Sequence, residues 1–174
     1  IQAVTTDPTG DVTEGQVWYN TSSDTFKTTL LTEAWASASS VITKRRTAAS
    51  GGTQTANFIA GGQTPSYTAA TEEYNGTGWS SGANAPSAHA SGFGAGTLTA
   101  GLIFGGTTDP GGQEGITTTA EYDGSSWTTS GALNQKRWSG GSGAGTQTAA
   151  LCSAGYNDGN VTNSEEYNGS SWTA

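Results

Sequence analysis

The sequence predicts an all-β fold in which a unit of four short antiparallel strands occurs three times. Two recurring patterns predict it. A hairpin signature reads EEYNGTGW, AEYDGSSW and EEYNGSSW at Glu72–Trp79, Ala120–Trp127 and Glu165–Trp172. An apolar run of strand length that ends in glycine precedes each hairpin, at Thr53–Gly62, Thr97–Gly106 and Thr146–Gly155. Internal repetition of this kind indicates a propeller or another repeat array.

Each hairpin signature contains a turn between two strand segments. Asn-Gly and Asp-Gly accept the positive φ angles of a type I′ turn, so we expect tight hairpins with positive φ at the glycine. In the first copy the strands are predicted at about Thr71–Tyr74 and Gly78–Ser80. The aromatic residues on either side of the three turns are Tyr74 and Trp79, Tyr122 and Trp127, and Tyr167 and Trp172. The tyrosines repeat after 122 − 74 = 48 and 167 − 122 = 45 residues.

The other two strands of each unit lie upstream. The apolar strand, predicted at about Thr55–Ala60 in the first copy, is typical of a strand buried on both faces. In two copies it ends in a glycine pair, at Gly61, Gly62, Gly105 and Gly106. Before it runs a strand of small residues, which is tolerated where backbones crowd together. A basic residue opens each unit, at Arg45, His89 and Arg137, and we expect the arginines to pair with Glu73, Glu121 or Glu166 or to bind loop carbonyls.

The register of the repeat divides the chain. Residues 1–34 are interpreted as a polar N-terminal segment with a β-hairpin at Gln16–Lys27, and residues 35–174 as the array. Trp35 would begin the strand that leads into it, and the repeats span about 45–83, 89–131 and 137–174. Three repeats are fewer than the 4–8 blades of ordinary propellers, so either more repeats lie outside this sequence or subunits associate to cover the open sheet edges, and we expect an oligomer. The expected contacts are the strand near Val17–Tyr19 or the one near Trp172.

Composition excludes several classes of function. The net charge is −8, whereas nucleic-acid binding needs clustered Lys and Arg, so no nucleic-acid partner is expected. No run approaches the ~18 apolar residues of a membrane span. One cysteine, Cys152, allows no intrachain disulfide, and its place in an apolar strand predicts a buried thiol.

The unit resembles the kelch repeat, whose marks are a basic residue, a strand ending in Gly-Gly, and Tyr and Trp about a hairpin. The resemblance covers about Arg45–Trp172 and implies that each repeat forms one blade of a β-propeller. The departures are Ala154-Gly155 in the third copy and His89 in place of arginine. The phrases GQVWYNTSSDTFK, GTQTAAL and TEEYNGTGW are similar to kelch-like arrays in bacteriophage tail fibres and other virion appendages.

Residues suited to catalysis are scarce. His89 is the only histidine, and one His with one Cys cannot supply a zinc site. The adjacent carboxylates Glu72-Glu73 and Glu165-Glu166 suggest glycoside hydrolysis, but neighbours in a strand point to opposite faces. We therefore expect no catalytic residue, no metal and no cofactor.

Candidate binding residues lie outside the repeat register. Trp138 follows Arg137 where the other copies have Arg46 or Ala90, and Tyr156 follows Ala154-Gly155 in the third copy. The loop before the tyrosine strand is longer in the middle copy and carries Asp109 and Glu114. Long loops on a constant scaffold often bind ligands, although a neutral insertion explains this one equally well. Trp138 in a subunit interface is likewise an equal alternative.

The sequence thus favours a non-enzymatic structural protein of a virion appendage. Its expected role is attachment to a host-surface glycan as a homo-oligomer among other virion proteins, which places it in the virion, outside the cell. The alternative is a secreted bacterial adhesin or carbohydrate-binding propeller. The third interpretation is an enzyme that resembles sialidases or galactose oxidase.

Overall fold

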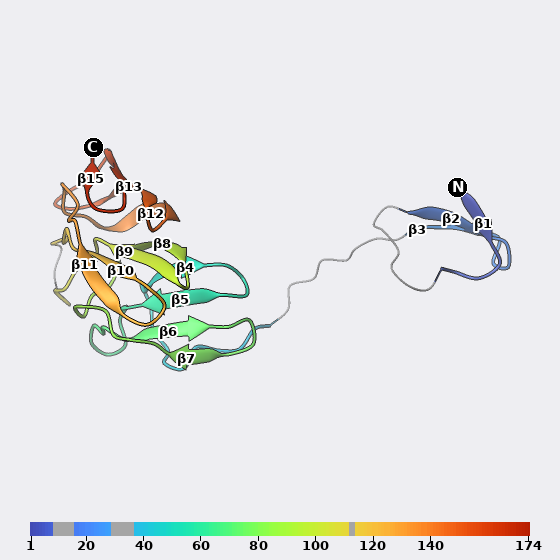
Figure 1. Cartoon of the computed structure of the whole chain (residues 1–174), viewed down its shortest axis with the longest axis horizontal. Helices are drawn as coiled ribbons and strands as arrows, with labels where there is room; N and C mark the ends of the chain where they lie inside the picture. Colours follow the sequence, from blue (N-terminus) through green and yellow to red (C-terminus); the bar gives the residue numbers. More distant parts are fainter. Residues whose placement is uncertain (9–15, 29–36, 112–113) are drawn as a thin grey trace. The chain divides into compact units, whose positions relative to one another are not determined.

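The computed structural model describes residues 1–8, 16–28, 37–111 and 114–174. The chain divides into two compact units, Ile1–Ser37 and Ala38–Ala174 (Figure 1). The described residues form β-strands and no helix, which confirms the all-β prediction. They therefore contain no helix that is long and apolar enough to cross a membrane. The strand predicted to begin at Trp35 lies outside the described residues.

The described residues of the N-terminal unit form one three-stranded sheet. Strand β2 (Val17–Asn20) pairs in parallel with β1 (Gln2–Val4) and antiparallel with β3 (Thr25–Thr28). Asp7 ties the sheet together, because its carboxylate accepts hydrogen bonds from Lys27 Nζ at 2.6 Å, Asn20 Nδ2 at 2.7 Å and Trp18 Nε1 at 3.1 Å. These donors, Lys27 first, lower the pKa of Asp7 to about 2.

The larger unit contains three four-stranded antiparallel sheets, each made of consecutive strands in chain order. The first sheet comprises β4 (Ala49–Gly52), β5 (Asn57–Ala60), β6 (Thr71–Tyr74) and β7 (Trp79–Ser81). The second comprises β8 (Phe93–Thr97), β9 (Ala100–Phe104), β10 (Thr119–Tyr122) and β11 (Trp127–Ser130). The third comprises β12 (Trp138–Thr146), β13 (Ala149–Tyr156), β14 (Ser164–Tyr167) and β15 (Trp172–Thr173). None of these sheets, as far as the structure describes the chain, closes on itself.

The hairpins join Tyr and Trp as predicted, but the turn differs from type I′. Gly76, Gly124 and Gly169 have φ of 92°, 91° and 92°, whereas the preceding Asn or Asp does not have positive φ. Four residues separate the cross-strand partners Tyr74 and Trp79. The Asn75 side-chain oxygen accepts the backbone N–H groups of Thr77 and Gly78, both at 3.0 Å. The side chain therefore organises a longer loop, which makes a two-residue turn unnecessary.

The arginines bind the other glutamate of each pair. Arg45 forms an ion pair with Glu72, and Arg137 does so with Glu165 at 2.6 Å; all four side chains are almost fully buried. The expected pairing with Glu73, Glu121 or Glu166 is wrong: alternation along the strand turns Glu73 and Glu166 to the opposite face, and Glu121 accepts the Tyr167 hydroxyl. The expected loop carbonyls are bound as well: Arg137 Nη1 donates to Ala154 O at 2.9 Å.

The repeated aromatic residues join each sheet to the one before it. The indole N–H of Trp127 donates to Thr71 Oγ1 at 3.0 Å, and that of Trp172 to Thr119 Oγ1 at 2.9 Å. In the same way the Tyr122 hydroxyl donates to Glu73, and the Tyr167 hydroxyl to Glu121 at 2.5 Å. Strand β10 thus contributes to both junctions, because its alternate residues face the sheets on either side of it.

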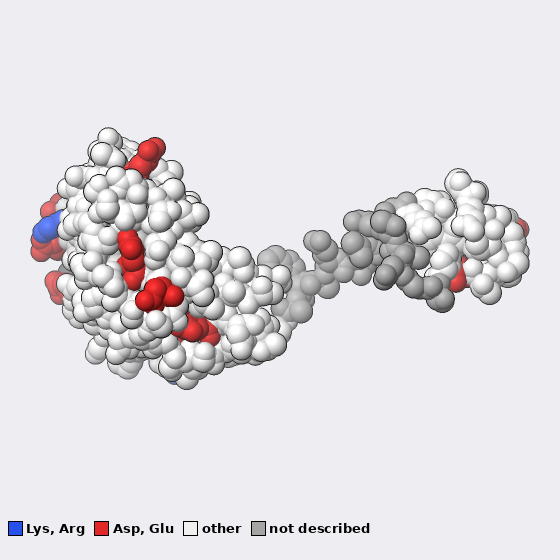
Figure 2. All heavy atoms as spheres, viewed as in Figure 1, with Lys and Arg blue, Asp and Glu red and all other residues white. Residues whose placement is uncertain are grey.

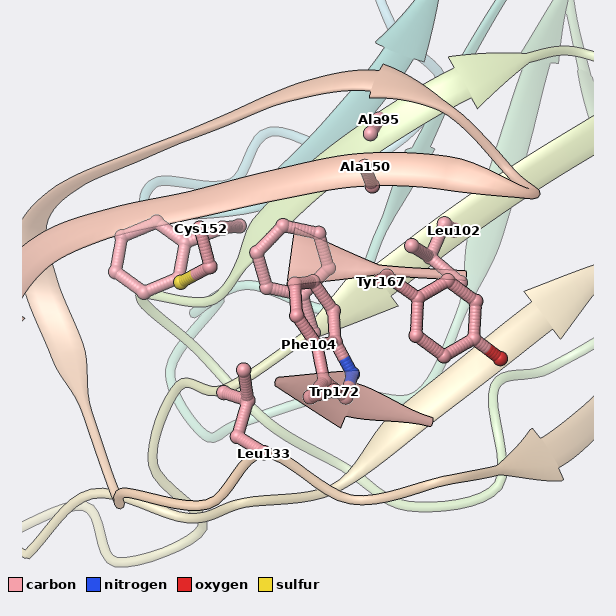
Figure 3. Packing of buried hydrophobic residues seen from close by; sticks show 9 residues of the cluster. Ala95, Leu102, Phe104, Leu133, Ala150, Cys152, Tyr167 and Trp172 are labelled. Atoms are coloured by element: carbon pink, nitrogen blue, oxygen red, sulfur yellow. The ribbon is translucent and has the colours of Figure 1, made fainter. Parts of the chain in front are cut away.

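Two hydrophobic clusters fill the junctions between the sheets. Figure 3 shows the cluster between the second and third sheets, where Phe104, Leu133, Cys152 and Trp172 converge. The rings of Phe104 and Trp172 meet edge to face with centroids 4.8 Å apart. Cys152 is fully buried as predicted, and burial raises the pKa of its thiol to about 11.

The strands of small residues lie against one another. Strand β8 packs against β4 on one side and against β12 on the other (Figure 1). A Cβ added to Gly94 would lie 2.2 Å from Ser50 O, and one added to Gly143 would lie 2.8 Å from Gly94 O. Glycine at these two positions therefore lets the backbones approach closely, as the small-residue pattern predicts.

Candidate functional site

The candidate site begins at a β-bulge where β12 and β13 meet at one end of their hairpin. Trp138 and Tyr156 are cross-strand partners, and the register shifts between Trp138 and Gly141. Within this bulge Ser139 has φ of 44° and Gly140 has φ of 70°. Bulges bend a strand and redirect its side chains, and they occur often beside functional sites.

The two aromatic rings form the walls of an open cleft. Their centroids are 5.8 Å apart and their planes meet at 86°, an edge-to-face arrangement that holds both rings in place. The cleft has a volume of about 470 Å³, and its other lining residues are Ser139, Gly140, Gly155 and Asn160. It thus combines apolar ring surface with hydroxyl and amide groups.

A tight turn brings Asn160 to the cleft. The backbone N–H of Asn157 donates to Gly159 O at 2.9 Å, and Asp158 has φ of 54°. Tyr156 then forms an isolated β-bridge with Asn160. Asn160 and Ser139 were not among the binding residues predicted from the sequence, although the Asn157-Asp158-Gly159 stretch is a recognisable turn signal.

A buried ion pair holds the backbone next to the cleft. Arg137 precedes Trp138 and is fully buried, and its Nη1 atom binds the carbonyl oxygens of Ala154 and Asn163 at 2.9 and 3.0 Å. Burial by itself would raise the pKa of Glu165, but hydrogen bonds from Asn134, Arg137 and Gln135 outweigh it and lower that pKa. The pair therefore stays charged and holds the backbone on either side of the cleft.

The inserted loop of the second sheet contacts the turn beside the cleft. Glu114 forms an exposed ion pair with Lys136, which lowers the pKa of Glu114. The backbone N–H of Gly115 donates to Asn157 Oδ1 at 3.1 Å, so the loop contacts the turn next to Tyr156. Asp109 accepts the Gly111 N–H at 3.1 Å and lines a separate hollow of about 300 Å³ together with Glu114 and Lys136.

The four predicted binding residues therefore occupy two hollows rather than one. Trp138 and Tyr156 share the aromatic cleft, and Asp109 and Glu114 share the smaller hollow. The repeated Tyr and Trp residues of the second and third sheets hydrogen-bond to the preceding sheet and are structural.

The aromatic pair is peculiar to the third sheet. The cross-strand pair at the same register is Arg46 and Gln63 in the first sheet and Ala90 and Thr107 in the second. The first-sheet pair lines a comparable hollow of about 530 Å³, in which Arg46 Nε donates to Gln63 Oε1 at 3.1 Å. The scaffold therefore folds with polar or small residues here, and the aromatic rings are not needed for its packing.

Charged side chains and metal ligands add little to the chemistry of the aromatic cleft. Figure 2 shows acidic side chains scattered over the visible face of the larger unit, with few basic ones. Among the described residues, no three His, Cys, Asp or Glu side chains gather into a group that could hold a metal ion.

Comparison with known proteins gives a likeness of fold. No protein-family model matches the chain, and no curated protein does. Solved structures do match. One is the structure of YjhT, with a TM-score of 0.62 and 19% sequence identity, covering 85% of this chain and 47% of that one. The chain thus spans about half the length of this structure, and at that identity the likeness concerns the fold alone.

Proposed function

We propose that this chain is a non-enzymatic, kelch-like β-propeller scaffold that binds a glycan in the cleft between Trp138 and Tyr156. The observation that carries the proposal is the cleft itself, an edge-to-face aromatic pair in a hollow of about 470 Å³. Ligand pockets commonly have volumes of about 300–1,000 Å³ and combine apolar walls with a few polar groups.

The propeller architecture is supported by the junctions between sheets. Each four-stranded sheet corresponds to one blade, with its small-residue strand against its neighbour's and its aromatic strands on the outside. The kelch marks have matching roles, since the basic residue binds the carbonyls after the apolar strand and the Tyr and Trp contact the preceding sheet.

A glycan suits the cleft on chemical grounds. The flat faces of Trp and Tyr match the apolar C–H faces of a sugar ring. The Asn160 amide and the Ser139 hydroxyl can exchange hydrogen bonds with sugar hydroxyl groups. Both residues are exposed, so they can exchange water for a ligand at little cost.

A non-enzymatic role is supported by what the carboxylates bind. Glu72 and Glu165 neutralise buried arginines. Glu73 and Glu121 accept tyrosine hydroxyl groups from the following sheet. These groups serve the scaffold.

The location of the protein is proposed from the amino-acid sequence of its repeats. Its similarity to arrays in phage tail fibres favours a virion appendage that contacts the host surface. A secreted bacterial adhesin would use the same cleft in the same way and is the alternative.

The first prediction tests glycan binding. Replacing Trp138→Ala together with Tyr156→Thr installs the pair that the second sheet already carries, so the fold should persist. We expect the wild-type protein to bind a subset of sugars on a glycan array, and the double variant to bind them at least about tenfold more weakly, or about 1.4 kcal/mol.

The control is Arg46→Ala with Gln63→Thr, which makes the same change in the first sheet and should leave binding unaltered. Absence of glycan binding by the wild-type protein would overturn the proposal. Retention of full binding by the Trp138 and Tyr156 variant would also overturn it.

A further inference from the structure

Each junction between sheets joins two different faces. The first junction lies between the first and second sheets, and the second junction lies between the second and third sheets. We call the face that a sheet turns to the next sheet its front, and the opposite face its rear. The front supplies hydrogen-bond acceptors, which are Thr71 and Glu73 in the first junction. The rear supplies the donors, Tyr122 and Trp127 in that junction. The second junction repeats this pattern with Thr119, Glu121, Tyr167 and Trp172.

Among the described residues of the larger unit, no sheet lies against the front of the third sheet. Leu151 stands at the register of Leu102 and Phe58, which are fully buried, yet it is 42% exposed. Ser164 and Glu166, at the acceptor positions, are also exposed. Together with neighbouring backbone, Leu151 and Glu166 line a hollow of about 350 Å³.

Likewise, no sheet that the structure describes in the larger unit lies against the rear of the first sheet. Tyr74, Trp79 and Ile59 are only half-buried there. The donors bind backbone carbonyls instead of a preceding sheet: Tyr74 donates to Gly76 O in its own turn at 3.0 Å, and Trp79 Nε1 donates at 3.1 Å to Ser39 O, in the segment that precedes the first sheet. These bonds are to exposed or half-buried groups and can be exchanged for acceptors on another sheet.

The sizes of the residues on the two unpartnered faces are complementary. In the first junction a large rear residue, Ile103, clusters with the small front residues Ala49 and Ala60. In the second junction the order is reversed, and the small Cys152 clusters with the large Phe93 and Phe104. At the same registers, the first sheet offers the large Ile59 and the third sheet offers Ser142 and Ser153. Ile59 against two serines repeats the large-on-small arrangement.

From this match of donors, acceptors and volumes we propose that a second copy of this chain docks its first sheet onto the third sheet of the first copy, and the reverse, in a closed head-to-tail dimer. Tyr74 and Trp79 of one copy then bond to Glu166 and Ser164 of the other. Head-to-tail contacts of this kind make a ring when the rotation closes. Two copies supply six four-stranded sheets, within the range of about 4–8 blades found in propellers.

The innermost strand sets the tightness of the new junction. Ser50 stands where the second and third sheets have Gly94 and Gly143, at the closest approach of the backbones. Its Cβ keeps the two copies slightly further apart at this point. Replacing Ser50→Gly should therefore strengthen the dimer severalfold.

The test is the mass of the full chain in sedimentation velocity over a concentration series. We expect a species of twice 17.5 kDa. Leu151→Arg, on the front, and Ile59→Arg, on the rear, should each weaken dimerisation at least tenfold. A mixture of the two variants should regain heterodimers, because that pair keeps one intact junction. Phe26→Arg is the matched control, an exposed apolar residue of the N-terminal sheet.

Thermal melting of each variant verifies its folding, and Leu151→Arg carries the test if Ile59→Arg does not fold. A monomer at every concentration, or a closed ring of any other number of copies, would overturn the proposal. A dimer that Leu151→Arg leaves intact, or that only Phe26→Arg disrupts, would also overturn it and would place association on the N-terminal strands.

Discussion

At the residue scale, the second sheet lacks the buried Arg–Glu ion pair that the first and third sheets have. In the first sheet Glu72 accepts the backbone N–H groups of Ile42 and Thr43 at 2.7 and 3.0 Å besides pairing with Arg45. In the third sheet Glu165 does the same with Asn134 and Gln135 at 2.6 and 3.1 Å. The second sheet has Ala120, His89 and Pro86 in place of the carboxylate, the cation and the first donor. All three positions differ from their counterparts in the other two sheets, so the second sheet contains no unpaired buried charge at this place.

His89 is left partly unpartnered by this exchange. The residue is 4% exposed, and its Nδ1–H donates to Ser87 O at 3.0 Å. Its Nε2 atom has no hydrogen-bond partner among the described residues. It borders a cavity of about 10 Å³, lined also by Pro86 and Ala120, which is room for about one water molecule. Burial lowers the pKa of His89 below its usual 6.5.

The second prediction concerns the pH dependence of stability. Because the folded-state pKa of His89 is lowered, the unfolded chain takes up this proton at a higher pH than the folded chain. The stabilisation is complete above pH 6.5 and is lost as the pH falls toward the folded-state pKa. We expect the free energy of unfolding in urea to decrease below pH 6.5, by at most about 1.4 kcal/mol per pH unit.

His89→Gln is the control, because the chain contains one histidine and the variant has none. Its unfolding free energy should be flat between pH 7.5 and 5.5. Equal slopes in the variant and the wild-type protein would show that the imidazole is not the group that titrates.

At the element scale, the hairpin turns are organised by one side chain and one glycine. Asp123 Oδ1 accepts the backbone N–H groups of Ser125 and Ser126, both at 2.7 Å, as Asn75 and Asn168 do in the other copies. The hydroxyl and backbone donors of these serines, led by the Ser125 hydroxyl, hold the pKa of Asp123 well below its ordinary value. Gly124 follows with φ of 91°.

The third prediction concerns this turn. Gly124→Ala should lower the free energy of unfolding by about 1–2 kcal/mol, because a residue with a Cβ is strained at positive φ. The added Cβ would also lie 3.2 Å from Thr99 Cγ2. Chemical denaturation measures the effect. Asp123→Asn is the control and should be nearly neutral at pH 7; a Gly124→Ala variant as stable as that control would contradict the role assigned to the glycine.

At the scale of the whole molecule, the three sheets form one unit through bonds that cross the junctions. The two indole-to-threonine bonds and the two tyrosine-to-glutamate bonds occur at equivalent positions. Thr119 and Tyr122 are fully buried, so a lost partner cannot be replaced by water. The sheets should therefore unfold together.

The fourth prediction tests this coupling. Thr119→Val keeps the volume of the side chain but leaves the buried indole N–H of Trp172 without an acceptor. We expect a loss of about 1–3 kcal/mol and one melting transition for the larger unit. Thr128→Val, on the exposed side of β11, should change stability little. Separate melting of the third sheet in the Thr119 variant would contradict the coupling, and calorimetry distinguishes the two results.

The sequence by itself determined the all-β class, the Tyr–turn–Trp hairpins and the buried Cys152, because these depend on local periodicity and turn chemistry. It also placed Trp138 and Tyr156 outside the repeat pattern. Which glutamate meets Arg137 was decided by the tertiary structure, because strand alternation commits Glu165 to one face and Glu166 to the other. The same holds for Asn160, which reaches the cleft only through the fold of its turn. Neighbouring sheets also give the repeated aromatic residues their partners, which lie about fifty residues away in the chain, beyond the reach of any local pattern.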